Sequence, residues 1–272
     1  MNASQTYRLG FIGAGKLAGS VIRGLMRAKF CAPSEVIASE PNEQTRDALK
    51  KETGINLAAE NAEVADKADV IFVGVKPGMV LSVLKELGDK LQNKAVISLA
   101  GGVRIARMEQ NGNARFMRAL TNTPAAICRA ATGIARGSRS TNEDVDLAKT
   151  IFAAIGVVVE IEESQIDIVT ALSGSGPAFV YAIIDAFANA GTKLGLDETV
   201  SNQLAIQTVL GAAELMLESK MSAEDLIKMV VTPGGTTAAG LAVMEKMKTR
   251  ESLIAAVEAA TKRGQEMAKE NQ

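Results

Sequence analysis

The stretch Gly13–Ala18, with the pattern G-x-G-x-x-A, constrains the fold of this chain more than any other feature. It closes the apolar run Arg8–Gly13, which predicts a buried strand, and it opens a segment with helical spacing. Gly13 permits a tight turn, Gly15 lets the backbone approach an anion, and Ala18 allows close packing of the helix. We therefore predict that the N–H groups at the start of this helix bind the pyrophosphate of a dinucleotide.

The order of apolar runs and helical segments predicts two domains. Runs and helices alternate over the first ~160 residues, which indicates a parallel sheet covered on both faces. Helical periodicity then dominates to the end of the chain. We predict an α/β chain with a Rossmann dinucleotide-binding domain over residues 1–162 and an all-helical domain over residues 163–272. The other expected strands are Glu35–Ser39, Ile55–Leu57, Asp69–Val75, Ala95–Leu99, Ala114–Leu120, Ala130–Arg136 and Val157–Ile161. The expected helices include Lys149–Ala154, Gly176–Leu194, Asp197–Glu218 and Arg250–Lys269, with Asp197 and Ser222 as N-caps.

The composition argues against several classes of protein. The chain has no histidine, which removes any mechanism with a histidine base or ligand. Its two cysteines, Cys31 and Cys128, are too far apart in sequence to suggest a disulfide framework or a zinc site, so no metal is expected. A net charge of -1 and 3% aromatic residues argue against nucleic acid as a partner. The polar N-terminus lacks a signal-peptide pattern, and no apolar run approaches the ~20 residues that span a bilayer. We therefore expect a cytoplasmic protein with no membrane partner.

The end of the second strand bears on the choice of cofactor. A carboxylate at this position, here Glu40, usually bonds the ribose hydroxyls and repels a 2′-phosphate, which favours NADH. Ser39, Asn42, Arg46 and Asn61 could equally hold the phosphate of NADPH. The sequence therefore leaves the cofactor open between NADPH and NADH.

The ends of the fourth and fifth strands are expected to line the same crevice. They read Gly74-Val75-Lys76-Pro77 and Ala100-Gly101-Gly102, and small residues there leave room for a flat nicotinamide. Lys76 is interpreted as an electrostatic or structural contact rather than as a catalytic group. The predicted cofactor-binding residues in this part of the chain are Ile12, Gly13, Ala14, Gly15, Lys16, Leu17, Ser39, Glu40, Asn61, Val75, Lys76, Pro77, Ala100, Gly101 and Gly102.

Three further stretches are too particular to be ordinary connectors: Thr121–Pro124 (TNTP), Leu172–Ala178 (LSGSGPA) and Val231–Thr237 (VTPGGTT). With GFIGAG, VKP, QTVLGAAELMLES and TPGGTTAAGL they follow an order that resembles the pyrroline-5-carboxylate reductases over essentially the whole chain. The resemblance implies NAD(P)H-dependent hydride transfer to the C=N bond of 1-pyrroline-5-carboxylate, giving L-proline in the last step of proline biosynthesis. It also adds Asn122, Thr123 and Pro124 to the cofactor-binding residues.

The resemblance further implies a helical domain that interlocks with a second subunit in a homodimer. In some members of the family the dimers assemble into a larger ring, such as a decamer. The sequence agrees with an oligomer, because the helices over residues 176–217 are apolar on most faces and one copy supplies little to bury them.

The glycine turn before the second-last helix makes physical sense as a clamp for the substrate carboxylate. Pro233–Gly235 would expose consecutive N–H groups just before a helix that starts near Thr236, and such a nest binds anions. Following the family, Thr237 would hydrogen-bond the ring nitrogen and is the one catalytic residue expected. Because the cofactor carries the hydride, the reaction needs no histidine. The predicted substrate-binding residues are Ser175, Gly176, Thr232, Pro233, Gly234, Gly235, Thr236 and Thr237.

The chain departs from the usual family pattern at four positions. Gly74 and Gly101 stand where alanine is common, Glu40 replaces a more phosphate-tolerant residue, and Thr232 replaces a serine. None of these changes removes a required group, although Glu40 bears on the choice between the two cofactors.

Two other functions fit the same architecture. A hydroxyacid dehydrogenase would carry a catalytic lysine on the long helix of its second domain, where this chain has only Lys193 at the far end. A non-enzymatic NAD(P)-binding sensor is permitted by the fold alone. The turn before Thr236 argues against such a sensor, because a sensor has no need to bind an amino-acid-like anion.

Overall fold

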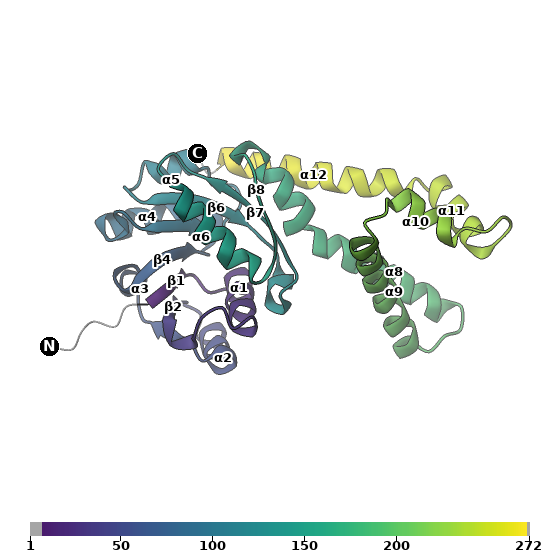
Figure 1. The fold of residues 1–272 in the computed structure, drawn as a ribbon, viewed down its shortest axis with the longest axis horizontal. Helices are drawn as coiled ribbons and strands as arrows, with labels where there is room; N and C mark the ends of the chain where they lie inside the picture. The colour runs from purple at the N-terminus through teal and green to yellow at the C-terminus, as the bar shows by residue number, and fades with distance from the viewer. Residues whose placement is uncertain (1–6, 271–272) are drawn as a thin grey trace. The chain divides into compact units, whose positions relative to one another are not determined.

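An eight-stranded sheet forms the centre of the N-terminal part of the chain (Figure 1). The computed structural model describes residues 7–270. The strand order is β3-β2-β1-β4-β5-β6-β7-β8, and the first six strands follow the order of Rossmann domains. The predicted α/β fold is therefore confirmed. The strands are β1 (Tyr7–Ile12), β2 (Val36–Ser39), β3 (Asn56–Ala58), β4 (Ala68–Val73), β5 (Ala95–Ser98), β6 (Arg115–Leu120), β7 (Ala130–Arg136) and β8 (Gly156–Glu160).

One pair of strands departs from the parallel arrangement. β7 runs antiparallel to β6, with Leu120 opposite Gly133, whereas β8 is again parallel to β7. The link between β6 and β7 holds only a short helical turn, Thr123–Ile127. A parallel crossover needs about a dozen residues or more, so a connection this short reverses the chain direction.

The sheet has a separate apolar core on each face, because alternate strand residues point to opposite sides. On one face, Phe11 and Phe72 stack with their ring centroids 4.6 Å apart, in the core that α1, α2 and α6 help to form. On the other face, α3, α4 and α5 pack against residues such as Ile71. These helices are α1 (Lys16–Arg27), α2 (Glu43–Thr53), α3 (Asn61–Lys67), α4 (Val80–Leu87), α5 (Ile105–Glu109) and α6 (Asn142–Ala153).

Helix α6 is longer than the sequence pattern predicted, because a capping box starts it early. Thr141 accepts a hydrogen bond from the Asp144 N–H, and the Asp144 carboxylate accepts one from the Thr141 N–H. Asp144 also receives two hydrogen bonds from Arg115, at 2.7 and 2.9 Å. Burial alone would raise the pKa of Asp144, but the bonds from Arg115 and Thr141 outweigh it and lower this pKa below its ordinary value.

Replacing Asp144 with asparagine is expected to lower the free energy of unfolding at neutral pH by about 3 kcal/mol, because Arg115 loses its charged partner. The folded pKa of Asp144 is depressed, so its stabilisation is complete above the unfolded pKa of ~3.9 and is lost as the pH falls through the folded value. Urea unfolding at pH 7 and in steps from pH 5 to pH 2 should show that the free energies of unfolding of the two proteins become equal in acid. The same change at Asp146, an exposed residue of α6, is the control. If the difference in free energy of unfolding between the wild type and Asp144→Asn stayed constant in acid, the stabilising role given to the ionised Asp144 would be contradicted.

The remainder of the chain is helical. The elements are α7 (Ile166–Val169), the π-helical turn Thr170–Gly174, α8 (Gly176–Lys193), α9 (Glu198–Ser219), α10 (Ala223–Val230), α11 (Thr236–Lys246) and α12 (Thr249–Glu270). The two predicted N-caps are confirmed: Asp197 accepts from the N–H groups of Thr199 and Val200, and Ser222 accepts from that of Asp225. By contacts, the chain forms two compact units, of which one is Gly176–Val257. The other contains the sheet, continues to Ser175, and also includes the chain from Glu258 onward.

The expectation that no apolar run approaches the length of a membrane span was wrong. The stretch Glu163–Lys193 is helical and has a mean hydropathy of 1.4 in its most apolar window, so its length and composition alone would allow it to cross a membrane. The physical reason is that Leu172–Ala178 does not break the helix. Residues Thr170–Gly174 form a π-helical turn, and the segments before and after it join into one apolar stretch.

Candidate active site

The turn between β1 and α1 has the geometry of a pyrophosphate cradle. Gly13 adopts φ +80°, and the N–H groups of Gly13 and Ala14 donate to the Ser39 carbonyl at 3.0 and 3.2 Å. Gly15 is the N-cap of α1 and has no side chain that could accept from the first turn. The N–H groups at the start of α1 are therefore not capped by a side chain, which suits an anion.

The end of β4 packs directly against this turn because residue 74 is glycine. A Cβ atom at Gly74 would lie 2.4 Å from the Gly13 carbonyl oxygen and 2.7 Å from the Ala18 Cβ. A Cβ atom at Gly13 would lie 2.9 Å from the Val75 nitrogen. The predicted residues Gly13, Val75 and Ala18 are thus brought together, and the position of the turn depends on the absence of side chains at two glycines.

The end of β2 brings the polar residues predicted for the adenosine half beside the same turn. The Ser39 hydroxyl donates to Asn61 Oδ1 at 2.7 Å, which joins β2 to α3. Glu40 Oε1 accepts from the Asn42 N–H at 3.0 Å, and Glu40 Oε2 lies 3.8 Å from the point where a Cβ of Gly15 would be. An open depression of about 530 Å³ adjoins Gly15; its lining residues are Gly15, Lys16, Arg23, Asn42, Gln44, Thr45 and Ala48.

Lys76 and Pro77 follow β4 at the same edge of the sheet. Lys76 is exposed, and its backbone carbonyl accepts from the Met79 N–H at 2.9 Å at the start of the short helical turn Pro77–Met79. Its ammonium group has no ion pair within residues 7–270. The interpretation of Lys76 as an electrostatic contact remains a prediction.

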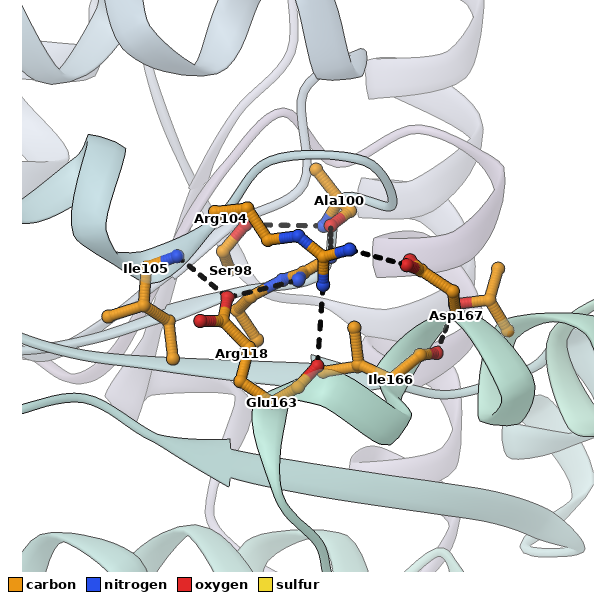
Figure 2. A network of polar contacts seen from close by, with 9 residues as sticks. Ser98, Ala100, Arg104, Ile105, Arg118, Glu163, Ile166 and Asp167 are labelled. Carbon is orange, nitrogen blue, oxygen red and sulfur yellow. Dashed lines mark hydrogen bonds and ion pairs between the residues drawn. The ribbon is translucent and has the colours of Figure 1, made fainter. Parts of the chain in front are cut away.

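The loop Ala100–Gly102, at the end of β5, lies against a network of charged residues that the sequence analysis missed (Figure 2). Arg118, on β6, is fully buried and pairs with Glu163 at 3.1 Å. Arg104 pairs with the buried Asp167 at 2.6 Å. Burial lowers the pKa of Arg118, and the nearby Glu163 opposes that shift. The available signal was Arg118, which lies among apolar residues in the interior of the strand, since arginine is rarely buried without a partner.

The Asn122 side chain makes two hydrogen bonds within the protein. Its Nδ2 donates to the Ser173 carbonyl at 3.1 Å, and its Oδ1 accepts from the Ala131 N–H at 3.2 Å. The amide therefore links the turn after β6 to the π-helical turn before Ser175. The exposed Thr123 and the half-buried Pro124 remain available on this turn. The assignment of Asn122, Thr123 and Pro124 to the cofactor site remains a prediction.

The turn Thr232–Gly235 precedes α11 in the helical unit. Gly234 adopts φ +73°, and Gly235 is an N-cap with no side chain to offer. The expected row of consecutive free N–H groups is interrupted, because Gly235 donates to the Thr232 carbonyl at 2.9 Å and closes the turn. Helix α11 does begin at Thr236, as predicted, so its first-turn N–H groups, including that of Thr237, are left without a side-chain cap.

Comparison with known proteins decides the family. Residues 163–267 match the family model described as pyrroline-5-carboxylate reductase dimerisation, and residues 8–102 match that described as NADP oxidoreductase coenzyme F420-dependent. A pyrroline-5-carboxylate reductase of Synechocystis sp. is 39% identical over 96% of this chain and 98% of its own length. The chain belongs to the pyrroline-5-carboxylate reductase family. The human relative pyrroline-5-carboxylate reductase 2 is 39% identical over 95% of this chain and 83% of its own length.

Solved structures of pyrroline-5-carboxylate reductases share the fold over nearly the whole chain. That of Plasmodium falciparum, with NADP bound, has a TM-score of 0.89 and 30% identity, and the match covers 98% of this chain and all of the other. That of Coxiella burnetii has a TM-score of 0.87 and 34% identity, with 97% and 99% covered. A 3-hydroxyisobutyrate dehydrogenase of Mycobacterium tuberculosis reaches 14% identity, a TM-score of 0.50, and coverage of 71% and 67%, so it shares the fold alone. The alternative of a hydroxyacid dehydrogenase is therefore not favoured.

Proposed function

We propose that this chain reduces 1-pyrroline-5-carboxylate to L-proline with NAD(P)H. The observation that carries the proposal is the glycine turn Gly13–Gly15, positioned for a pyrophosphate, in a chain whose family is defined by this reaction. Bound NAD(P)H supplies a hydride to the imine carbon and is oxidised to NAD(P)+, while the protonated ring nitrogen becomes the amine of proline. The protein's part is to bind both partners, orient them and exclude water.

The residues of the chain fall into three roles in this proposal. The N–H groups at the start of α1 bind the pyrophosphate, and the loops at residues 75–77, 100–102 and 122–124 line the nicotinamide half. The turn Thr232–Thr236, with Ser175 and Gly176, binds the substrate carboxylate. The hydroxyl oxygen of Thr237 accepts a hydrogen bond from the N–H of the protonated ring nitrogen. A threonine hydroxyl is too weak an acid to serve as a proton source by itself, so this bond orients the ring.

Association of the chain into oligomers follows from its match to the dimerisation family, and we propose a homodimer as the basic unit, with larger rings built from dimers. The helical unit has little apolar burial of its own, because large side chains such as Leu204, Leu215 and Leu217 are exposed. A second copy would cover them. The same association would cover the apolar stretch Glu163–Lys193, so a soluble cytoplasmic enzyme is part of this proposal.

Steady-state oxidation of NADH and NADPH with racemic 1-pyrroline-5-carboxylate tests the function. The wild-type protein should turn over, and Thr237→Ala should lower kcat/KM about tenfold, which is the effect of losing one hydrogen bond of ~1.4 kcal/mol. Thr249→Ala is the matched control, because Thr249 also lies in the first turn of a helix. Wild-type protein that binds a dinucleotide but reduces no cyclic imine would contradict the proposal and favour the sensor. Equal rates for Thr237→Ala and the wild type would remove only the role given to this hydroxyl.

A further inference from the structure

Arg118 is a buried cation whose place in the sheet connects it to the cofactor loop. It lies opposite Ser98 in the pairing of β5 with β6. Ser98 is the last residue of β5, so Arg118 lies next to the start of the loop that follows this strand. Its side chain has no exposed surface, and its Nη2 lies 3.5 Å from the Ala100 carbonyl oxygen, at the long limit for a hydrogen bond. The Nε atom has no hydrogen-bond partner in the described chain. Because no part of Arg118 reaches solvent, it is no candidate for contact with substrate.

Glu163 connects Arg118 to the start of α5, which follows the same loop. Its Oε1 atom accepts from Arg118 Nη1 at 3.1 Å and also from the Ile105 N–H at 2.7 Å. The Ala100 carbonyl precedes Gly101 and Gly102, whereas Ile105 follows them. One carboxylate and one guanidinium therefore hold the loop from both sides (Figure 2).

Neighbouring contacts tie the loop to the segment after the sheet. Arg104 donates to Asp167 at 2.6 Å, and it contacts the Glu163 carbonyl at 3.4 Å. A Cβ atom at Gly101 would lie 3.9 Å from Thr170 Cγ2 in the π-helical turn. The two glycines give the loop conformational freedom, and these contacts restrict its position from outside.

The stability of the fold alone gives little reason for a charged pair at this position. Replacing a buried ion pair with apolar residues of similar size is often neutral or stabilising. A loop at the carboxyl end of a parallel strand, in contrast, lies where a dinucleotide binds, and beyond β4 it lies on the nicotinamide side. Displacement of a reacting group by about 1 Å can cost on the order of 100-fold in rate.

We propose that Arg118 and Glu163 are positioning residues, which hold the loop Ala100–Gly102 in the place that the nicotinamide half of the cofactor requires. This inference rests on the proposed function for its kinetic consequences. It predicts that loss of Arg118 impairs binding of the whole dinucleotide and leaves binding of its adenosine half unchanged. A role confined to stability would affect neither affinity in the folded protein.

The test compares Arg118→Met with Arg115→Met. Both arginines lie on β6 and are paired with a carboxylate, but Arg115 pairs with Asp144 at the beginning of the strand. Measurements are the Kd of NADH, the Kd of ADP-ribose, the kcat and KM with 1-pyrroline-5-carboxylate, and the Tm. We expect Arg118→Met to raise the Kd of NADH at least tenfold and to lower kcat/KM at least tenfold. The Kd of ADP-ribose should stay within about twofold of the wild-type value. Arg115→Met should lower the Tm and leave both affinities and kcat/KM near the wild-type values.

Glu163→Gln keeps the test decisive if Arg118→Met does not fold, because Glu163 is partly exposed and glutamine retains an acceptor. It should show the same pattern as Arg118→Met to a smaller degree. The proposal is overturned if the folded variant of either residue keeps the NADH affinity and kcat/KM of the wild type. It is also overturned if Arg118→Met with Glu163→Leu restores both the Tm and kcat/KM. Should wild-type protein bind NADH and reduce no imine, the proposed function fails, and the two affinities still test the positioning role.

Discussion

Gly13→Ala should raise the Kd of NADH by on the order of 100-fold. Gly13 adopts φ +80°, which costs a residue with a side chain about 1–2 kcal/mol. The new Cβ would also lie 2.9 Å from the Val75 nitrogen and 2.7 Å from its Cγ1, and such crowding costs about 1–3 kcal/mol when the backbone must shift. Together these terms reach about 3 kcal/mol. The free variant relieves this strain by moving the turn, so restoring the binding geometry costs this free energy, which corresponds to roughly 100-fold in the Kd.

Fluorescence titration of NADH measures this loss directly. Gly112→Ala is the matched control, since a Cβ there would meet no atom within 4 Å and its backbone needs no left-handed conformation. Gly112→Ala should bind NADH as the wild type does. If folded Gly13→Ala bound NADH with unchanged affinity, the binding of the pyrophosphate would not depend on this turn.

The parts of the fold that the sequence predicted are those controlled by local signals. The turn Gly13–Ala18 predicted β1 and α1 because glycine conformation and helix packing act over a few residues. The caps Asp197 and Ser222 were predictable for the same reason, since a capping side chain bonds N–H groups two or three residues away. The direction of β7 was not predicted, because it depends on the length of a connection whose helical turn has no strong periodicity.

The residues that sequence reasoning missed act over long distances in the chain. Arg118 and Glu163 are 45 residues apart, and their pairing arises only when the segment after β8 returns to the end of β5. Asn122 was predicted for its motif, but its two hydrogen bonds depend on where β7 and the π-helical turn lie. The π-helical turn Thr170–Gly174 was not predicted either. Such features depend on tertiary packing, which one sequence does not display.

Glu40 should make the enzyme prefer NADH, and Glu40→Ser should shift the ratio of kcat/KM for NADH and NADPH toward NADPH by about 10- to 100-fold. The Glu40 carboxylate lies beside Gly15, at the end of β2, which is the position where Rossmann domains usually bind the adenosine ribose. Two unit charges of the same sign ~5 Å apart repel by about 3 kcal/mol at an effective dielectric constant of ~20, and salt reduces this value. The 2′-phosphate of NADPH carries more than one negative charge. Before screening by salt, Glu40 should therefore weaken the binding of NADPH by at least this free energy.

The measurement is the kinetics of both cofactors at low and at physiological salt, with Glu60→Ser as the control. Glu60 is an exposed carboxylate that follows β3, so it changes the net charge equally without lying beside Gly15. If the carboxylate acts locally, Glu40→Ser changes the cofactor ratio and Glu60→Ser does not. A wild-type preference for NADPH that Glu40→Ser leaves unchanged would mean that Glu40 turns away from the ribose. The phosphate would then be held by Ser39, Asn42, Arg46 or Asn61, of which Arg46 alone carries a positive charge at that strand end.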